Sequence, residues 1–377
     1  MEVIQIPINK STGLEAPRFC VLGAGHGGMA MAGHLGLMGY QVNLYNRSES
    51  RLTPVSLSGG IELTGMIEGF GPVKLATTDI GEAIRDVDIL MVVIPANGHA
   101  FMAEKVAPHL QDGQFILLNP GRTGGALEFR NILKKMGCQA EVIVGEAQTL
   151  LYASRNLNPA QVRIFGVKNT IPIAALPGQH TVKLVKKLRQ VYPQFVPGDN
   201  VIKTSLDNIG AIFHPALTVL NAARIESTRG EFQFYMEGVT PSVAHVLEAL
   251  DEERVSVAAA LGIRAMSARE WLYMAYDAPG KTLFEAMRNN HGYKGINAPS
   301  MVDHRYLWED VSMSLVPIAS LGEHLDVPTP TIRNIIHLAS LMNQTDYWGS
   351  GRTVEKMGLT GLSVVEIRRL ALEGDPG

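Results

Sequence analysis

Short apolar runs alternate with stretches of helical spacing throughout the first half of the chain. Near-continuous apolar runs predict strands buried on both faces, as in a parallel sheet, and the stretches between them predict covering helices. The runs are residues 19–22, 41–45, 88–94, 114–118, 141–144 and 162–167. Residues 60–65 and 72–76 alternate between apolar and polar positions and predict an inserted hairpin. The first half is therefore expected to be an α/β domain around a mostly parallel sheet.

The periodicity changes near residues 193–199, where prolines and glycine interrupt the pattern. Beyond this point the apolar spacing is mostly helical. A long helix is expected to begin at Ser205, with further helices over 241–262, 265–276 and 311–325. The Val-Pro-Thr-Pro-Thr stretch at 327–331 is expected to end one helix and start another that reaches Leu341. We therefore predict two domains, residues 1–197 and an all-helical domain of residues 198–377. Residues 1–16 are expected to be a short extension before the first strand.

A glycine-rich turn follows the first predicted strand and opens a helix of small residues. Its residues are Gly23, Ala24, Gly25, His26, Gly27 and Gly28. The spacing is Gly-x-Gly-x-x-Gly, in which the first glycine permits the turn, the second admits a pyrophosphate and the third lets helix and strand pack closely. A glycine turn without a ligand is the alternative, since the chain has 38 glycines. Because a second strand follows one helix later, we predict a Rossmann-type dinucleotide site.

The end of the second strand indicates which dinucleotide binds. NAD sites usually carry Asp or Glu there for the ribose 2′-hydroxyl, whereas this chain has Asn46, Arg47 and Ser48. A guanidinium can pair with a 2′-phosphate, and Asn46 and Ser48 can donate hydrogen bonds to it. The sequence therefore favours NADP(H), with NAD(H) possible. In the alternative interpretation Arg47 is solvated and Glu49 binds the ribose.

Two strand ends further along the chain are candidates for cofactor or substrate contact. Pro95 and Ala96 follow the strand at 88–94, and cofactors bind at such strand ends in parallel sheets. Residues 119–126, Asn-Pro-Gly-Arg-Thr-Gly-Gly-Ala, form a second glycine-rich turn that opens a helix. This turn suits contact with substrate or nicotinamide, or it is a plain turn with a helix cap.

Composition narrows the classes of function. The net charge is −3 with 18% charged residues, which gives no sign of a nucleic-acid surface or a polybasic membrane patch. No apolar run is long enough to span a membrane, and the N-terminus does not read as a signal peptide. Cys20 and Cys138 make no disulfide framework, and no metal site is expected. We therefore expect a cytoplasmic protein.

His214 is the first candidate for catalysis, because it lies on the first helix after the predicted domain junction. At helical spacing Asp207, Gly210, Leu217 and Asn221 share its face, which is mostly small and polar where a buried helix would normally carry apolar residues. A titratable imidazole on such a stripe suits acid–base chemistry. The alternative is a core histidine whose hydrogen bonds are satisfied.

Residues 304–310, His-Arg-Tyr-Leu-Trp-Glu-Asp, form the second candidate cluster. Arg305 could bind a substrate carboxylate through two parallel hydrogen bonds. Asp310 could accept from an imidazole N–H and orient the ring. A solvated charged loop is the alternative.

Specific segments throughout the chain resemble the opine dehydrogenases of the octopine/nopaline group, including the N-(1-D-carboxyethyl)-L-norvaline dehydrogenase branch. The matching segments are residues 23–35, 119–130, 214–227, 235–243, 305–317 and 353–362. The resemblance implies a Rossmann-type domain followed by a helical domain. It also implies that His214 and Asp310 form a catalytic dyad and that Arg305 binds substrate. One departure is the Asn46–Arg47 pair, where several family members have an acidic residue.

The reaction that this resemblance implies joins an L-amino acid to an α-keto acid, with pyruvate expected. The resulting imine is reduced by NAD(P)H to a secondary amine dicarboxylate, and a homodimer is expected. One alternative is an NADP-dependent hydroxy-acid dehydrogenase related to ketopantoate reductases. Another is a dinucleotide-sensing protein without turnover, which the intact His214, Arg305 and Asp310 argue against.

Overall fold

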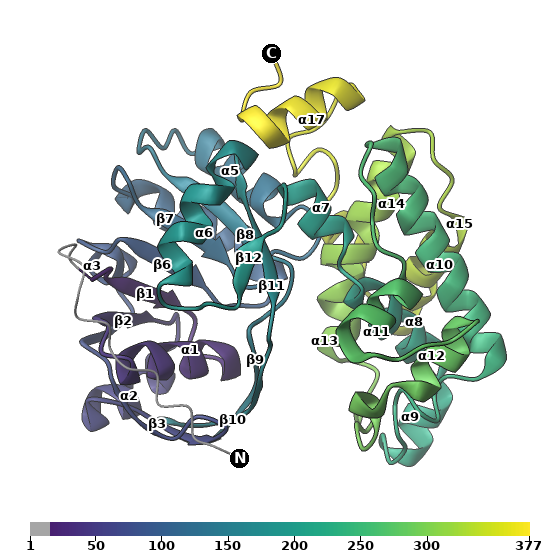
Figure 1. Cartoon of the computed structure of the whole chain (residues 1–377), viewed down its shortest axis with the longest axis horizontal. Helices are drawn as coiled ribbons and strands as arrows, with labels where there is room; N and C mark the ends of the chain where they lie inside the picture. The colour runs from purple at the N-terminus through teal and green to yellow at the C-terminus, as the bar shows by residue number, and fades with distance from the viewer. Residues whose placement is uncertain (1–15) are drawn as a thin grey trace. The chain divides into compact units, whose positions relative to one another are not determined.

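The computed structural model describes residues 16–377, which form two compact units (Figure 1). The first unit contains residues 16–121, 125–201 and 371–374. The second contains residues 122–124, 202–370 and 375–377. The predicted N-terminal extension therefore lies outside the described residues, apart from Ala16. The tripeptide 122–124 belongs to the second unit although the sequence around it belongs to the first.

An eight-stranded sheet forms the core of the first unit, in the strand order β12-β11-β8-β7-β6-β1-β2-β5. All its pairings are parallel except that between β8 and β11. The strands are β1 (Phe19–Leu22), β2 (Val42–Tyr45), β5 (Leu75–Thr77), β6 (Ile89–Val92), β7 (Phe115–Leu118), β8 (Ile143–Ala147), β11 (Ile171–Leu176) and β12 (Phe195–Pro197). Strands β1, β2, β6 and β7 are buried along their whole length, as their apolar runs predicted. The predicted α/β fold is confirmed.

A second sheet of four strands lies in the same unit, in the order β4-β3-β10-β9. Its strands are β3 (Gly60–Gly65), β4 (Gly69–Pro72), β9 (Tyr152–Asn158) and β10 (Gln161–Val167). Helix α1 (His26–Leu37) contacts all four of these strands as well as β1 and β2, so it lies between the two sheets (Figure 1). This explains why α1 is buried nearly all round.

Two predictions about these strands were wrong. Residues 162–167 do not continue the main sheet, because β10 pairs with β3 and β9 instead. Its side chains alternate between buried Val162 and Ile164 and exposed Arg163 and Phe165, the pattern of a sheet covered on one face. The hairpin partner of β3 is β4, whereas β5 joins the edge of the main sheet beside β2.

Helices flank the main sheet and make up nearly all of the second unit (Figure 1). Along the chain they are α2 (Thr53–Ser58), α3 (Ile80–Ile84), α4 (His99–Val106), α5 (Gly125–Lys135), α6 (Thr181–Arg189), α7 (Val201–Leu206), α8 (Gly210–Leu220), α9 (Ala222–Thr228), α10 (Pro241–Ala260), α11 (Ala268–Tyr276), α12 (Leu283–Asn289), α13 (Arg305–Trp308), α14 (Val316–His324), α15 (Pro330–Met342), α16 (Tyr347–Ser350) and α17 (Val364–Glu373). Among the described residues, no helix has the length and apolar character needed to cross a membrane.

The single long helix expected from Ser205 is broken in the structure. Helix α7 ends at Leu206 and α8 begins at Gly210. Asp207 lies in the break, where its carboxylate accepts hydrogen bonds from Lys203 Nζ (2.7 Å) and from the backbone N–H of Met266 (2.9 Å). Both contacts hold the Asp207 side chain in the break. Asp207 therefore does not share the helix of His214.

The glycine turn after β1 depends on one very close backbone approach. A Cβ placed on Gly28 would lie 1.7 Å from the carbonyl oxygen of Gly23, far inside any allowed contact. Gly23 itself has a φ of 118°, which side chains rarely adopt. A Cβ on Gly25, in contrast, would have no neighbour within 4 Å. The first and third glycines are therefore required by packing, whereas the second faces open space.

We expect Gly28→Ala to lower the free energy of unfolding by about 1–3 kcal/mol, because the methyl group must push α1 away from β1. Gly25→Ala is the matched control and should stay within about 0.5 kcal/mol of the parent. Chemical denaturation followed by circular dichroism measures both. Equal destabilisation by the two substitutions would contradict this account of the turn.

Candidate functional site

His214 and Asp310 form a hydrogen-bonded pair in the second unit. His214 lies in the second turn of α8, and Asp310 lies between α13 and a π-helical turn, Val311–Leu315. The imidazole Nδ1 lies 2.7 Å from Asp310 Oδ2, with the carboxylate fully buried and 22% of the His214 side chain exposed. Single π-helical turns recur at functional sites because they redirect side chains. The pair leaves the other imidazole nitrogen, Nε2, available to a reacting group.

The second oxygen of Asp310 faces a buried arginine. Oδ1 lies 2.9 Å from Arg122 Nη2, a charge contact without the geometry of a well-directed hydrogen bond. Burial alone would raise the pKa of the Asp310 carboxyl, but Arg122 and His214 together hold that pKa below its usual value. Asp310 is therefore a buried carboxylate with the Arg122 guanidinium at one oxygen and the His214 imidazole at the other.

Arg122 reaches this position from the second glycine-rich turn. Its backbone is left-handed, with a φ of 59°, a conformation that costs a non-glycine residue about 1 kcal/mol. The next two residues hold it there: the Thr123 N–H donates to the carbonyl of Met313 (3.2 Å), and the Gly124 N–H donates to Ser205 Oγ (2.9 Å). The buried side chain of Arg352 donates to the Thr123 carbonyl at 2.8 Å.

Glu309 joins Arg122 to Arg305. Its side chain is 1% exposed, with Oε1 at 3.4 Å from Arg122 Nε and Oε2 at 2.7 Å from Arg305 Nη2. Arg305 Nε also donates to Oε2 at 3.0 Å. Since a guanidinium has five N–H donors and Arg305 is 50% exposed, the rest of its fork is available to a ligand. His214, Asp310, Arg122, Glu309 and Arg305 thus form one row of neighbouring charged or titratable groups.

Aromatic rings complete the walls around His214. Tyr306 stacks on the imidazole with ring centroids 4.1 Å apart and planes 17° from parallel, and Phe234 stacks on the far side of Tyr306. Burial raises the pKa of the Tyr235 and Tyr306 hydroxyls, so both phenols stay neutral. Burial and the Arg305 charge lower the pKa of His304, whose ring contacts the edge of Tyr306. The aromatic rings therefore restrict the orientation of the His214 imidazole, and the neutral phenols add no charge beside it.

The structure brings together the three residues that the sequence proposed for chemistry, His214, Arg305 and Asp310. Sequence reasoning missed Arg122 and Glu309. Both lie in segments that were singled out, but polarity alone did not distinguish a buried arginine in a turn from a solvated one. The small residue at 210 was a usable signal, since a Cβ on Gly210 would lie 3.1 Å from Arg122 Nη1 and 3.6 Å from the His214 ring.

The predicted dinucleotide turn lies in the first unit. Helix α1 begins after Gly25 with no side-chain cap and no acidic residue in its first turn, so its N–H groups and the positive dipole end suit a phosphate. The backbone of His26 is anchored from β9, because Ser154 Oγ donates to its carbonyl (3.1 Å). The Asn156 N–H donates to the His26 ring Nδ1 at 3.0 Å. Together with the open space beside Gly25, these features fit a bound pyrophosphate.

The residues after β2 lie against the same turn. Asn46 Oδ1 accepts from the Ala24 N–H at 3.2 Å, and Arg51 Nη1 donates to the Ala24 carbonyl at 3.3 Å. The Arg47 guanidinium lies 6.0 Å from the Phe101 ring centre, and no ion pair to a carboxylate holds it among the described residues. Arg51 was not proposed from the sequence, and its contact with the turn adds a second cation near that end of the sheet.

Pro95 and Ala96 lie three and four residues after the end of β6 at Val92. Ala96 is buried, and the Pro95 carbonyl accepts from the Gly98 N–H at 2.9 Å, which turns the chain into α4. Gly23 packs against the carbonyl of the neighbouring Val93, so the ends of β1 and β6 lie together, as the predicted cofactor edge requires. Within residues 16–377, no three His, Cys, Asp or Glu side chains are grouped to hold a metal ion.

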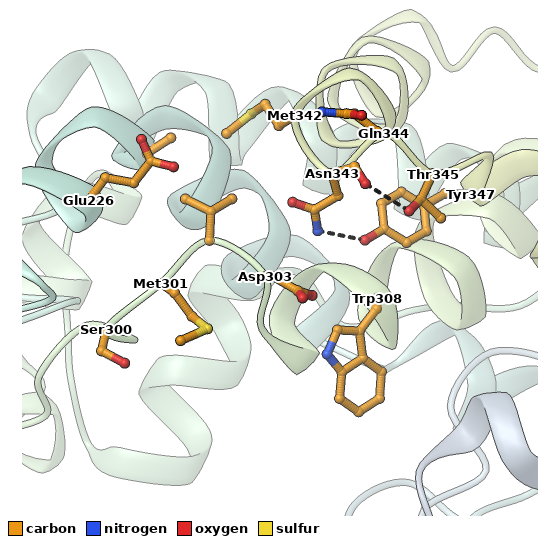
Figure 2. A pocket seen from close by; sticks show the side chains of 12 residues that line it. Glu226, Ser300, Met301, Asp303, Trp308, Met342, Asn343, Gln344, Thr345 and Tyr347 are labelled. Carbon is orange, nitrogen blue, oxygen red and sulfur yellow. Dashed lines mark hydrogen bonds between the residues drawn. The ribbon is translucent and has the colours of Figure 1, made fainter.

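The second unit also contains an open pocket of about 720 Å³ that does not include His214, Arg305 or Asp310. Figure 2 shows Trp308 and Asp303 on one side and the segment from Met342 to Tyr347 on another. Asn343 Nδ2 donates to the Tyr347 hydroxyl at 2.8 Å, which ties that wall together (Figure 2). Trp308 and Arg305 are the last and first residues of α13, so the same short helix contributes to the pocket and to the charged row.

Comparison with known proteins agrees with both units. Residues 197–343 match the alpha-helical domain of NAD/NADP octopine/nopaline dehydrogenase, and residues 18–121 match the NAD binding domain of 6-phosphogluconate dehydrogenase. An opine dehydrogenase of Arthrobacter sp. (strain 1C) is 40% identical over 356 residues, covering 94% of this chain and 99% of the relative. The ocs protein of Agrobacterium tumefaciens (strain Ach5) is 26% identical and covers 95% and 99%.

Solved structures share the fold. Octopine dehydrogenase with NADH and L-arginine matches with a TM-score of 0.77 at 20% identity, covering 91% of this chain and 96% of that one. Yersinopine dehydrogenase with NADP+ matches with a TM-score of 0.74 at 16% identity, covering 91% and 97%. The chain is thus an NAD(P)-dependent oxidoreductase. Its helical domain matches the octopine/nopaline dehydrogenase model, and its similarity to the Arthrobacter enzyme extends along almost all of both chains. It belongs to the opine dehydrogenase family.

Proposed function

We propose that this enzyme condenses the amino group of an L-amino acid with an α-keto acid, with pyruvate as the expected keto acid. The observation that carries the proposal is the pairing of an acid–base dyad, His214–Asp310, with a half-exposed arginine, Arg305, in one charged row. Structures of octopine dehydrogenase with pyruvate and with L-arginine support this substrate pair. Acid–base chemistry and carboxylate recognition are the two functions that such a condensation requires.

Atoms balance in two stages. The amine nitrogen attacks the ketone carbon and passes one proton to the former ketone oxygen. One further proton lets the hydroxyl leave as water, and a protonated imine remains. NAD(P)H, when bound, would supply the hydride, and its addition to the imine carbon gives the neutral secondary amine. His214 would protonate the departing hydroxyl through Nε2, while the Asp310 carboxylate accepts from Nδ1 and stabilises the imidazolium. Stacking on Tyr306 would hold the His214 imidazole in a fixed plane relative to the reacting atoms.

Arg305 would bind one substrate carboxylate. Glu309 holds one edge of the guanidinium and leaves the rest of the fork exposed, so the arginine is oriented before substrate arrives. Holding two reactants in the correct orientation contributes several kcal/mol to catalysis. In this proposal the row therefore places the carboxylate, and with it the reacting carbon, relative to the dyad.

The proposed cofactor preference is NADP(H) over NAD(H). Arg47 and Ser48 follow β2, where a 2′-phosphate would lie, and Arg51 contacts the turn beside them. Asn46 is already bonded to the turn through Oδ1, and its Nδ2 donates to the Ser48 carbonyl, so we assign it to turn structure more than to phosphate binding. Binding of either dinucleotide would use Gly23 to Gly28 and the edge at Pro95 and Ala96.

We further propose a cytoplasmic homodimer. Exposed apolar side chains on the C-terminal helices support the dimer, among them Leu341 at 62% exposed and Val365 at 74%. Light scattering of the purified chain tests the dimer. A screen of L-amino acids, L-norvaline included, against pyruvate, glyoxylate and 2-oxoglutarate tests the substrate assignment through loss of NADPH. Keto-acid reduction without any amino acid would instead indicate a hydroxy-acid dehydrogenase.

His214→Ala should lower kcat by about 10²–10⁴ while the protein stays folded and binds cofactor, because a positioned proton donor is lost. Asp310→Asn should be similarly impaired, since an amide cannot stabilise the imidazolium. If the residues act as one unit, the double variant should be little worse than either single variant. Steady-state kinetics with cofactor titration measures all three, and near-normal kcat in His214→Ala would remove it from the mechanism.

Arg305→Lys should raise KM for one carboxylate substrate strongly, because a lysine keeps the charge but not the planar fork. Cofactor affinity should stay the same, as measured by fluorescence titration of NADPH. A variant that instead lost NADPH binding would place Arg305 in the cofactor site.

Arg47→Ala should weaken NADPH binding by about 1.5–3 kcal/mol, the range for a charge-assisted hydrogen bond, and leave NADH binding nearly unchanged. Isothermal titration with each cofactor makes the comparison. Arg51→Ala serves as the second variant, because Arg51 is the other cation beside the turn. Equal losses for the two cofactors in Arg47→Ala would rule out the 2′-phosphate contact.

A further inference from the structure

Arg122 is the one member of the charged row that touches two carboxylates and lies too deep to be an obvious substrate ligand. It is 9% exposed, and its guanidinium lies between Asp310 and Glu309. Each of those carboxylates has a second partner that the proposed function uses, His214 for one and Arg305 for the other. Arg122 therefore connects the acid–base pair to the substrate-binding arginine.

We propose that Arg122 is a positioning residue that sets the protonation behaviour of the His214–Asp310 dyad and, through Glu309, the availability of Arg305. This inference rests on the proposed function, and it assigns Arg122 no contact with substrate or cofactor.

The first step of the argument concerns Asp310. A fully buried carboxylate is costly unless it is paired, and Arg122 is its permanently charged partner. With Oδ1 held against Arg122, Oδ2 is directed at His214 Nδ1. The cation also opposes a positive imidazolium nearby. Without Arg122, the protonated dyad would be favoured and would persist to higher pH.

The second step concerns Glu309. Its two oxygens are divided between Arg122 and Arg305, at 3.4 Å and 2.7 Å. Without Arg122, Glu309 would lose one of the cations that share its charge, and its attraction for Arg305 would grow. Glu309 would then compete more strongly with a substrate carboxylate for the same guanidinium. The loss of Arg122 should therefore raise KM for that substrate, although Arg122 never contacts it.

The third step is that the fold accepts strain to place this side chain. Arg122 adopts the left-handed conformation, Gly210 leaves room for the guanidinium, and Arg352 fixes the following carbonyl. Strained backbone held by surrounding contacts is typical of functional sites.

The charged and titratable groups that face the dyad come from several elements. They are Arg122 from the turn at 122–124, His304, Arg305 and Glu309 from the segment around α13, and the neutral phenols Tyr306 and Tyr235. Of these, Arg122 has the largest opposing influence on Asp310 after burial, so its removal is the informative change.

The test is a pH titration of His214 by NMR on the full chain labelled with ¹⁵N-histidine. Spectra of His214→Gln assign the signal among the 11 histidines. In Arg122→Gln we expect the His214 midpoint to rise by about one pH unit, the lower end of the usual effect of a close charge. Arg122→Lys keeps the charge and should shift the midpoint by less than about half of that. The pH profile of kcat/KM should move in the same direction.

Arg254→Gln is the matched control. Arg254 is also a fully buried arginine of the second unit, and it pairs with Asp251 at 2.6 Å and donates to the carbonyls of Leu206 and Met266. It should lower the melting temperature without moving the His214 midpoint. The proposal is overturned if folded Arg122→Gln titrates like the parent, or if Arg254→Gln produces the same shift.

If Arg122→Gln does not fold, steady-state kinetics of Arg122→Lys test the proposal instead. A lysine cannot reach both carboxylates with a planar fork, so KM for the keto acid should rise while the His214 midpoint stays near that of the parent. Unchanged KM and kcat would overturn the proposal. The NMR titration needs no turnover, so the His214 midpoint can be measured even if the substrate screen finds no substrate. Failure of that screen would count against the proposed function alone.

Discussion

The buried carboxylate of Asp310 is the constraint on which the proposed site depends. It is fully buried, and its two oxygens face His214 on one side and Arg122 on the other. A charge removed from water in this way is tolerable only when both oxygens have partners. Because the partners come from α8 and from a turn far away in the sequence, the second unit must assemble around Asp310 before the imidazole has a defined orientation.

The pairing of buried charges continues from Asp310 to Arg305 through Glu309, the residue before Asp310. Glu309 is nearly as buried as Asp310 and has a cation on each side. Arg305 and Glu309 are four residues apart across α13, a spacing at which side chains meet on a helix. Glu309 and Asp310 lie between α13 and the π-helical turn Val311–Leu315, and as consecutive residues they face different partners. One short segment thereby supplies both carboxylates and the exposed arginine.

The first unit depends on a different constraint, the approach of Gly28 to the backbone of Gly23. That approach lets α1 begin directly above the strand, with unpaired N–H groups at its start. The second sheet adds support from the other side, since β9 bonds both the backbone and the ring of His26. The turn is therefore held rigidly while the side of Gly25 stays open, as a phosphate site requires.

The sequence by itself determined the parallel sheet and the glycine turn, because strands buried on both faces must be apolar and a close helix–strand approach must use glycine. It also singled out His214, Arg305 and Asp310, through a polar stripe on a helix, a charged cluster and family-specific segments. Only the tertiary structure decided that residues 162–167 form a separate sheet, since alternation and continuous burial look alike in a short apolar run.

Tertiary structure also decided the role of the charges. His214 and Asp310 are 96 residues apart, and Arg122 and Glu309 are 187 apart. Local hydrophobic periodicity does not predict such pairings, because it indicates only which face of an element is buried. Whether an arginine in a glycine-rich turn is solvated or buried between two carboxylates depends on which distant elements pack around it. That is why Arg122 could be seen in the sequence but its place in the site could not.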